Sequence, residues 1–154
     1  MSKPPRGAIR VELAHRFEVG LREGFDYITD LRNWPEYWPD LVRVEPGSRW
    51  SEPGDHARLV LRLLGRETEM AMTLGRIEPY RLVEYTSTQG DLPKVRHERH
   101  FADDGSGGLD YRLVVEYAPG AGRAASSIVC FSNAPSRAQW ARQSPTWRPD
   151  SPRT

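Results

Sequence analysis

The sequence has a single cysteine among its 154 residues, Cys130, which excludes an intrachain disulfide bond and a cysteine-based zinc site. No apolar run approaches the roughly 20 residues that a membrane-spanning helix needs. Residues 1–10 contain no apolar segment like that of a secretory signal peptide. With a charged fraction of 28%, these absences predict a cytoplasmic globular protein that has no integral membrane segment.

An excess of one charge is also lacking. The net charge is +1, and acidic and basic residues are interleaved except in residues 120–154, which contain five arginines and one aspartate. Proteins that bind nucleic acid present a basic stripe, so we expect no nucleic-acid partner. His97 and His100 lie three residues apart on a predicted strand and point to opposite faces, which disfavours a metal site. We therefore expect neither a metal nor a cofactor.

Signatures of several enzyme classes are missing as well. No serine has the flanking glycines of a nucleophile elbow, so hydrolase chemistry is unsupported. The glycine-rich residues 103–108 lie between two predicted strands rather than before a helix, which predicts a hairpin turn and not a phosphate-binding loop.

The segment from residue 21 to residue 44 contains the most distinctive pattern. Apolar residues recur at helical spacing from Leu21 to Leu31, so this part is predicted to form an amphipathic helix. The run WPEYWP follows at residues 34–39. Pro35 disfavours helical geometry at Trp34, and Pro39 does the same at Trp38. We expect a stiff aromatic corner that leads into an extended segment.

Most of the remaining chain alternates between apolar and polar residues, as half-buried strands do. The predicted strands are residues 9–19, 41–45, 55–64, 67–77, 81–88, 92–101 and 109–117. The alternation slips near Gly75, which predicts a β-bulge. One strand, a helical corner and six further strands predict an α+β fold with a curved antiparallel sheet.

Residues 9 to 119 resemble the START-like (SRPBCC) helix-grip superfamily, in particular its bacterial polyketide cyclase/dehydrase and lipid-transport branch. The resemblance rests on the first strand, the helix of residues 21–31, the WPEYWP corner and the run GRIEPYRLVEY at residues 75–85. It implies seven antiparallel strands with two short helices after the first strand, curled around a long C-terminal helix. An apolar cavity would lie between sheet and helix.

The end of the chain departs from this resemblance. Residues 122–154 are rich in arginine, serine and proline, and four prolines (Pro135, Pro145, Pro149 and Pro152) interrupt any long helix. We expect an N-terminal extension (1–8), a START-like domain (9–121) and a poorly ordered tail (122–154) whose closing helix is atypical or missing. The tail is either an altered reading frame or a natural extension with a shorter helix at residues 123–131. A missing helix would expose apolar sheet surface and favour a homodimer.

Polar side chains on the inward phase of the predicted strands supply the catalytic candidates. His97 and Arg99 would polarise a carbonyl group or hold a carboxylate, and Tyr85 would donate a proton. The alternative is that these groups pair with carboxylates near the ends of the sheet and have no chemical role. His15 has the same phase, and a single histidine there is more typical of a satisfied core residue.

A second set of residues would line an adaptable apolar pocket, because methionine and aromatic side chains accommodate varied ligands. It comprises Trp34, Tyr37, Trp38, Leu61, Met70, Met72, Ser87, Tyr111, Leu113 and Tyr117. The alternative is that they form ordinary core.

Three functions fit these patterns. The leading hypothesis is that an apolar or aromatic small molecule, lipid-like or polyketide-like, binds in an internal cavity. The second is an enzyme of the polyketide cyclase/aromatase type that acts on a poly-keto substrate. The third is a protein-interaction module. The fold alone does not choose between them.

Overall fold

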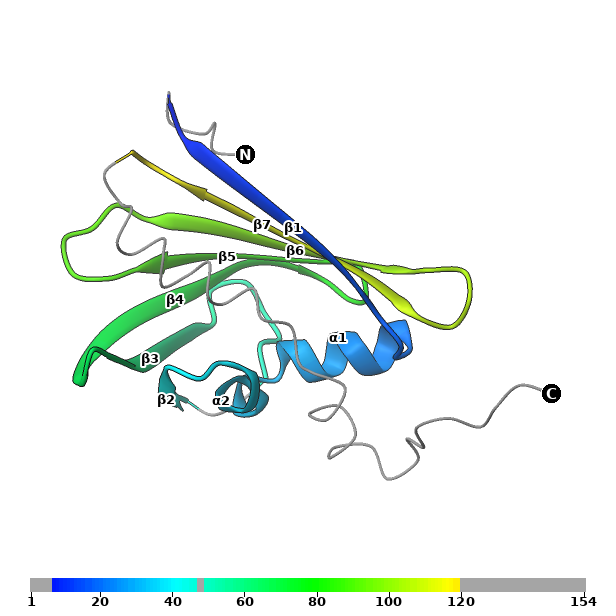
Figure 1. The fold of residues 1–154 in the computed structure, drawn as a ribbon, viewed down its shortest axis with the longest axis horizontal. Helices are drawn as coiled ribbons and strands as arrows, with labels where there is room; N and C mark the ends of the chain where they lie inside the picture. Colours follow the sequence, from blue (N-terminus) through cyan, green and yellow to red (C-terminus); the bar gives the residue numbers. More distant parts are fainter. Residues whose placement is uncertain (1–6, 47–48, 120–154) are drawn as a thin grey trace.

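The computed structural model describes residues 7–46 and 49–119, in which seven strands form one antiparallel sheet (Figure 1). In chain order the elements are β1 (Ile9–Phe17), α1 (Leu21–Thr29), the 3-10 helix η1 (Leu31–Asn33), α2 (Trp34–Tyr37), β2 (Leu41–Glu45), β3 (His56–Leu63), β4 (Arg66–Glu78), β5 (Leu82–Thr88), β6 (Val95–Asp103) and β7 (Leu109–Tyr117). The strand order is β1-β7-β6-β5-β4-β3-β2, so a meander from β2 to β7 is completed by β1 at its far edge. The predicted α+β fold is confirmed.

The helical corner connects β1 to β2, and its helices lie on one side of the sheet (Figure 1). The prediction for Trp38 holds, because its φ of −116° and ψ of 97° are extended ahead of Pro39. The prediction for Trp34 was wrong, since its φ of −58° and ψ of −41° are helical. Proline is tolerated in the first turn of a helix, and Pro35 takes that position in α2. The Trp34 indole also donates a hydrogen bond to the Ile28 carbonyl at 2.8 Å, which fixes the turn.

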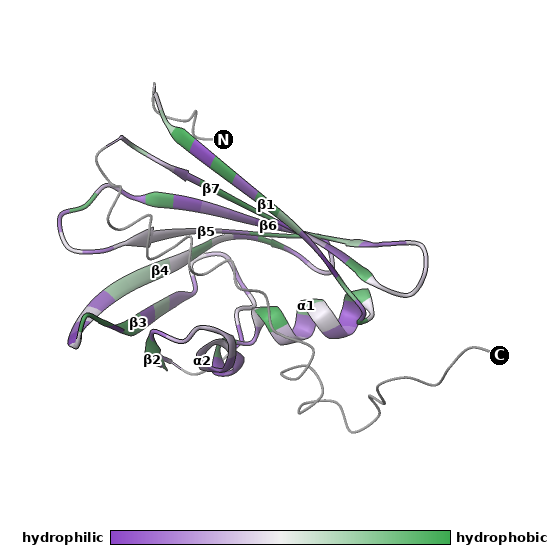
Figure 2. Ribbon diagram, in the orientation of Figure 1, coloured by the Kyte–Doolittle hydropathy of each residue, from purple (hydrophilic) through white to green (hydrophobic). Residues whose placement is uncertain are grey.

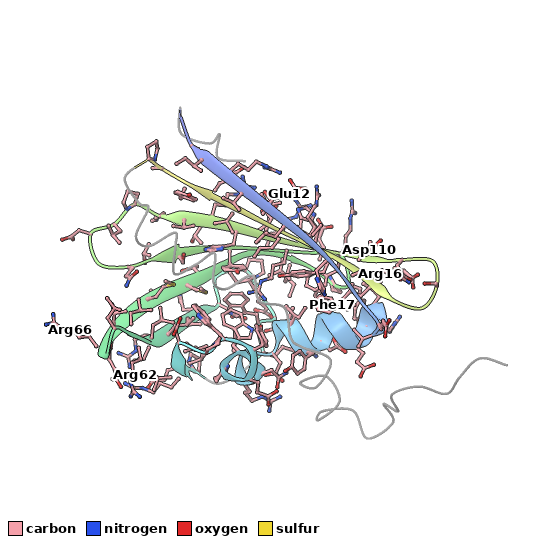
Figure 3. The ribbon with its side chains drawn as sticks, viewed as in Figure 1. Glu12, Arg16, Phe17, Arg62, Arg66 and Asp110 are labelled. Carbon is pink, nitrogen blue, oxygen red and sulfur yellow. The ribbon has the colours of Figure 1, made fainter. Side chains whose placement is uncertain are left out.

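The alternation along the strands separates two faces of the sheet. We call the face covered by α1 and α2 the inner face. Figure 2 shows the alternation as bands of opposite hydropathy along β1. In Figure 3 Phe17 lies toward α1, whereas Glu12, Arg16 and Asp110 lie on the opposite side. The pairing of β4 with β5 shifts register between Leu74 and Arg76, which confirms the bulge predicted near Gly75.

Ion pairs dominate the outer face. Arg96 on β6 reaches Glu84 on β5 at 3.8 Å and Glu116 on β7 at 3.5 Å, and Arg10 on β1 contacts the same Glu116 at 2.7 Å. Each exposed pair contributes between zero and about 1 kcal/mol. The hydrophobic core therefore lies on the inner face, between the sheet and the helical corner.

The first strand is less buried than its pattern predicts. Phe17 is buried, but Ile9 and Leu13 are 42% and 36% exposed and His15 is also exposed. Among the described elements, α1 lies beside only the Phe17 end of β1 (Figure 1). Alternation correctly predicted which side chains of β1 share a face. How deeply each of them is buried depends on the segments that pack against that face.

Some expectations lie outside the described residues. They concern the closing helix, the order of the tail and most of the N-terminal extension, residues 1–6. Within the described part of the chain, no helix has both the length and the apolar character needed to cross a membrane.

Candidate functional site

Four polar side chains meet on the inner face where β5 and β6 pair. Tyr85 lies opposite His97 in the register, and Arg99 lies opposite Val83. Because side chains two residues apart share a face, Ser87 joins Tyr85, and Arg99 joins His97. All four are at most 3% exposed. The structure thus brings together the three predicted catalytic residues and the predicted ligand-binding Ser87.

These side chains contact one another directly. The Ser87 hydroxyl and His97 Nε2 are 2.9 Å apart, within hydrogen-bond distance. Arg99 Nε donates a hydrogen bond to the Tyr85 hydroxyl at 3.1 Å. The Tyr85 and His97 rings are stacked, with centroids 4.4 Å apart and an interplanar angle of 4°. Hydrogen bonds among buried polar groups offset part of the cost of removing them from water.

Burial and the charge of Arg99 set the protonation of this cluster. Burial, followed by the positive charge of Arg99, lowers the pKa of His97 to about 3, so the imidazole is neutral at pH 7. Burial also raises the pKa of Tyr85, and it raises that of Tyr111 to about 12, with the charge of Arg99 opposing both shifts. The cluster therefore presents one cation among neutral hydroxyl and imidazole groups.

The aromatic corner packs against this cluster. The Arg99 guanidinium lies 5.2 Å from the Trp34 ring centroid and 5.3 Å from that of Tyr85, in cation–π contact with both. The ring of Trp50 lies 5.1 Å from Trp34, edge-on, and 5.1 Å from Tyr85. Arg99 thus carries its charge within an aromatic enclosure, and α2 and the chain before β3 supply the tryptophans.

Two polar atoms of this enclosure have no hydrogen-bond partner among the described residues. They are Trp50 Nε1 and the Tyr37 hydroxyl, on side chains that are 3% and 6% exposed. Burial, opposed first by the charge of Arg99, raises the pKa of Tyr37 well above its ordinary value. The contact between Tyr37 and Arg99 falls short of hydrogen-bond geometry. Buried polar atoms in native proteins usually have partners, so both atoms call for an explanation.

The sequence pattern did not single out Trp50, because this residue lies in a connection without periodicity. Its place is fixed by the hydrogen bond from its backbone N–H to the Thr29 carbonyl at 3.3 Å and by the β-bridge between Asp30 and Arg49. The only sequence signal was a large aromatic residue just before a predicted strand.

The other predicted ligand-binding residues divide into two groups. Five form a fully buried apolar wall, each at most 1% exposed: Trp38, Leu61, Met70, Met72 and Leu113. Met72 lies opposite Ser87 across β4 and β5, which brings this wall to the polar cluster. Tyr117 is only partly buried and pairs with Ile9 at the end of β7, so it lies at the margin.

An open groove of about 620 Å³ lies elsewhere, across β1, β7 and β6. Its lining includes Ala14, Arg16, His100, Asp110 and Arg112, which have the outward phase of their strands. Of the predicted site residues only Tyr111 borders it. Within residues 7–46 and 49–119, no group of three histidine, cysteine, aspartate or glutamate side chains could hold a metal ion.

Solved structures match this fold, although no protein-family model matches the chain and no curated protein matches its sequence. Ara h 8.0201 has a TM-score of 0.68 and 14% identity, over 88% of this chain and 94% of that chain. The Zhui aromatase/cyclase from Streptomyces sp. R1128 has a TM-score of 0.66 and 12% identity, over 88% and 93%. A START superfamily protein from Mycobacterium smegmatis has a TM-score of 0.59 and 12% identity, over 78% and 91%. The described part of the chain has the helix-grip fold of these solved structures.

Proposed function

We propose that this protein binds an apolar or aromatic small molecule, lipid-like or polyketide-like, on the inner face of its sheet beside the aromatic corner. The observation that carries the proposal is the convergence of Arg99, Tyr85 and His97 within an apolar and aromatic wall. A buried charge costs several kcal/mol of folding free energy, and buried ionisable groups with perturbed pKa values cluster at functional sites. An apolar site with a few converging polar groups is the usual form of a small-molecule site.

The similarity of fold supports this proposal in general terms. One structural neighbour is described as an aromatase/cyclase and another as a START superfamily protein. At 12% identity, neither transfers a ligand to this chain. The class of ligand is instead inferred from the apolar wall and the neighbouring Trp34. Met70, Met72, Trp38 and Trp34 offer polarisable and aromatic surface.

An enzyme acting on a poly-keto substrate is a second candidate, favoured by the hydrogen bond from Arg99 to Tyr85. That pair would stabilise the negative charge that develops on a carbonyl oxygen during an aldol-type cyclisation. His97 contributes less to this chemistry, because a pKa of about 3 makes it a poor proton acceptor at neutral pH. Catalysis would therefore depend on Arg99 and Tyr85.

A protein-interaction module has less support from the surface. The large exposed apolar residues among those described are Ile9, Leu13, Val42, Leu64 and Leu92, spread over two edge strands and two connections. A docking surface for a partner normally needs one continuous apolar patch.

The test is isothermal titration calorimetry of the full chain with 2-ethylnaphthalene and 2-acetonaphthone, two aromatic probes of similar shape. We expect saturable binding of at least one probe with a stoichiometry near one. Native mass spectrometry of the purified protein, first under gentle and then under denaturing conditions, should also release a co-purified small molecule. Absence of saturable binding for both probes would refute the proposal.

For the enzymatic candidate, Arg99→Met and Tyr85→Phe should abolish turnover of a poly-keto substrate in a chain that still folds. Retained turnover in both variants would exclude the roles given to these side chains.

A further inference from the structure

Trp50 Nε1, which has no hydrogen-bond partner among the described residues, points to the chemistry of the ligand. Trp50 Nε1 is a donor that cannot accept a hydrogen bond, and its side chain is 3% exposed. The neighbouring Trp34 differs, since its Nε1 donates to the Ile28 carbonyl at 2.8 Å. The ring centroids of these two indoles are 5.1 Å apart, and the described part of the chain supplies an acceptor to Trp34 Nε1 but not to Trp50 Nε1.

The polar groups of the enclosure around Arg99 include several hydrogen-bond donors. Its ring lies 5.1 Å from that of Tyr85, whose hydroxyl already accepts a hydrogen bond from Arg99. The guanidinium of Arg99 can only donate. The Tyr37 hydroxyl, which lacks a hydrogen-bond partner within residues 7–46 and 49–119, is close enough to Arg99 to feel its charge and can donate as well. An oxygen atom that accepts hydrogen bonds would satisfy this arrangement, whereas a purely apolar group would leave Trp50 Nε1 and the Tyr37 hydroxyl as they are among the described residues, without a partner.

We infer that the inner site selects ligands that carry an accepting carbonyl oxygen, and that Trp50 Nε1 and the Tyr37 hydroxyl are the donors that read it. This inference rests on the proposed function and adds to it the polar end of the ligand. Sites built to hydrogen-bond a polar group reject analogues that lack it, because buried polar atoms are then left without partners.

The two naphthalene probes test the inference, because 2-acetonaphthone has a carbonyl oxygen and 2-ethylnaphthalene has none. We expect the wild-type chain to bind the ketone about tenfold more tightly, which is the effect of one well-placed hydrogen bond. Trp50→Phe should reduce this preference to about twofold or less, since it removes the N–H and keeps an aromatic ring. Tyr37→Phe should reduce the preference in the same direction, and it tests the inference in a second fold-preserving way.

Thermal unfolding of the unliganded variants supplies a readout that needs no ligand. Trp50→Phe and Trp34→Phe both remove the same buried volume, but only Trp34→Phe also breaks a hydrogen bond of the indole N–H that the structure describes, so Trp50→Phe should lower the Tm by less than Trp34→Phe. Trp34→Phe is the matched control. It removes an N–H that has a partner, so it should lower the Tm. It should also weaken the binding of both probes equally, so that the preference for the ketone stays the same.

The outcomes separate the two proposals. Equal affinity of the wild-type chain for both probes would overturn the inference and leave the proposed function standing. A preference that survives both Trp50→Phe and Tyr37→Phe would also overturn it. So would a loss of Tm in Trp50→Phe as large as that in Trp34→Phe, because Trp50 Nε1 would then be bonded to a water molecule or within the fold. Failure of both probes to bind would remove the proposed function and the inference with it.

Discussion

Replacing His97 with phenylalanine should remove a pH dependence from the stability of this protein. The pKa of His97 is lowered from 6.5 to about 3, by burial and then by the charge of Arg99. Between these two values the unfolded chain binds a proton at His97 and the folded chain does not. The contribution of the neutral imidazole is therefore fully present above pH 6.5 and is lost as the pH falls below it.

The magnitude follows from linkage. Each pH unit inside this window lowers the free energy of unfolding by about 1.4 kcal/mol. At about pH 5, roughly 1.5 units below the unfolded pKa, the loss is about 2 kcal/mol relative to pH 7. Carboxylates add little in this range, because a group such as Asp30, whose pKa is lowered from 3.8, titrates at lower pH.

The assay is urea denaturation followed by circular dichroism from about pH 5 to about pH 8, with the free energy of unfolding extrapolated to water. His97→Phe keeps an aromatic ring against Tyr85 but cannot take up a proton. The variant should be less stable at pH 7, because the Ser87 hydroxyl loses its described partner, and its stability should be nearly flat over the same pH range.

His56→Gln is the control, since His56 is exposed and bonds only Thr73 on the outward phase of β3 and β4 among its described contacts. This variant should keep the slope of the wild type. A wild-type stability that does not change between about pH 5 and pH 7, or a His97→Phe variant with the full wild-type slope, would refute the assignment of a neutral buried imidazole.

Three further changes test the packing. Gly24→Ala should lower the free energy of unfolding by about 1–3 kcal/mol, because the added Cβ would lie 2.4 Å from a Leu109 methyl group. Gly20→Ala is the control and should not lower it, because nothing lies within 4 Å of its added Cβ; equal effects of the two substitutions in urea melts would contradict this. Leu64→Asn should raise the free energy of unfolding by about 0.5 kcal/mol, since Leu64 is fully exposed at a φ of +50° that asparagine tolerates better than leucine. A lower Tm of this variant would contradict the prediction. Ser87→Ala should cost about 1–3 kcal/mol in urea melts, because it leaves His97 Nε2 buried without its described partner, and an unchanged midpoint would show that the bond contributes nothing.

The sequence alone determined which side chains share a face. Alternation with a period of two is a local property, and it correctly assigned Tyr85, Ser87, His97 and Arg99 to the inward phase of two strands. It also located the bulge near Gly75, because an extra residue breaks the phase within a few positions. The helical corner could also be predicted, because the spacing of apolar residues along a helix is a local property as well. Trp34 nevertheless has helical geometry despite the following proline.

Only the tertiary structure decided which of these groups touch. The register of β5 against β6 places Tyr85 on His97, and Trp50 joins the cluster from a connection that lies 35 residues before Tyr85 in the sequence. The burial that holds His97 neutral also arises from residues distant in the chain, and so does the lack of an acceptor for Trp50 Nε1 in the part of the chain that the structure describes. The physical reason is that periodicity records the direction of each side chain relative to its own backbone. Burial, partners and pKa depend on what other segments place above it.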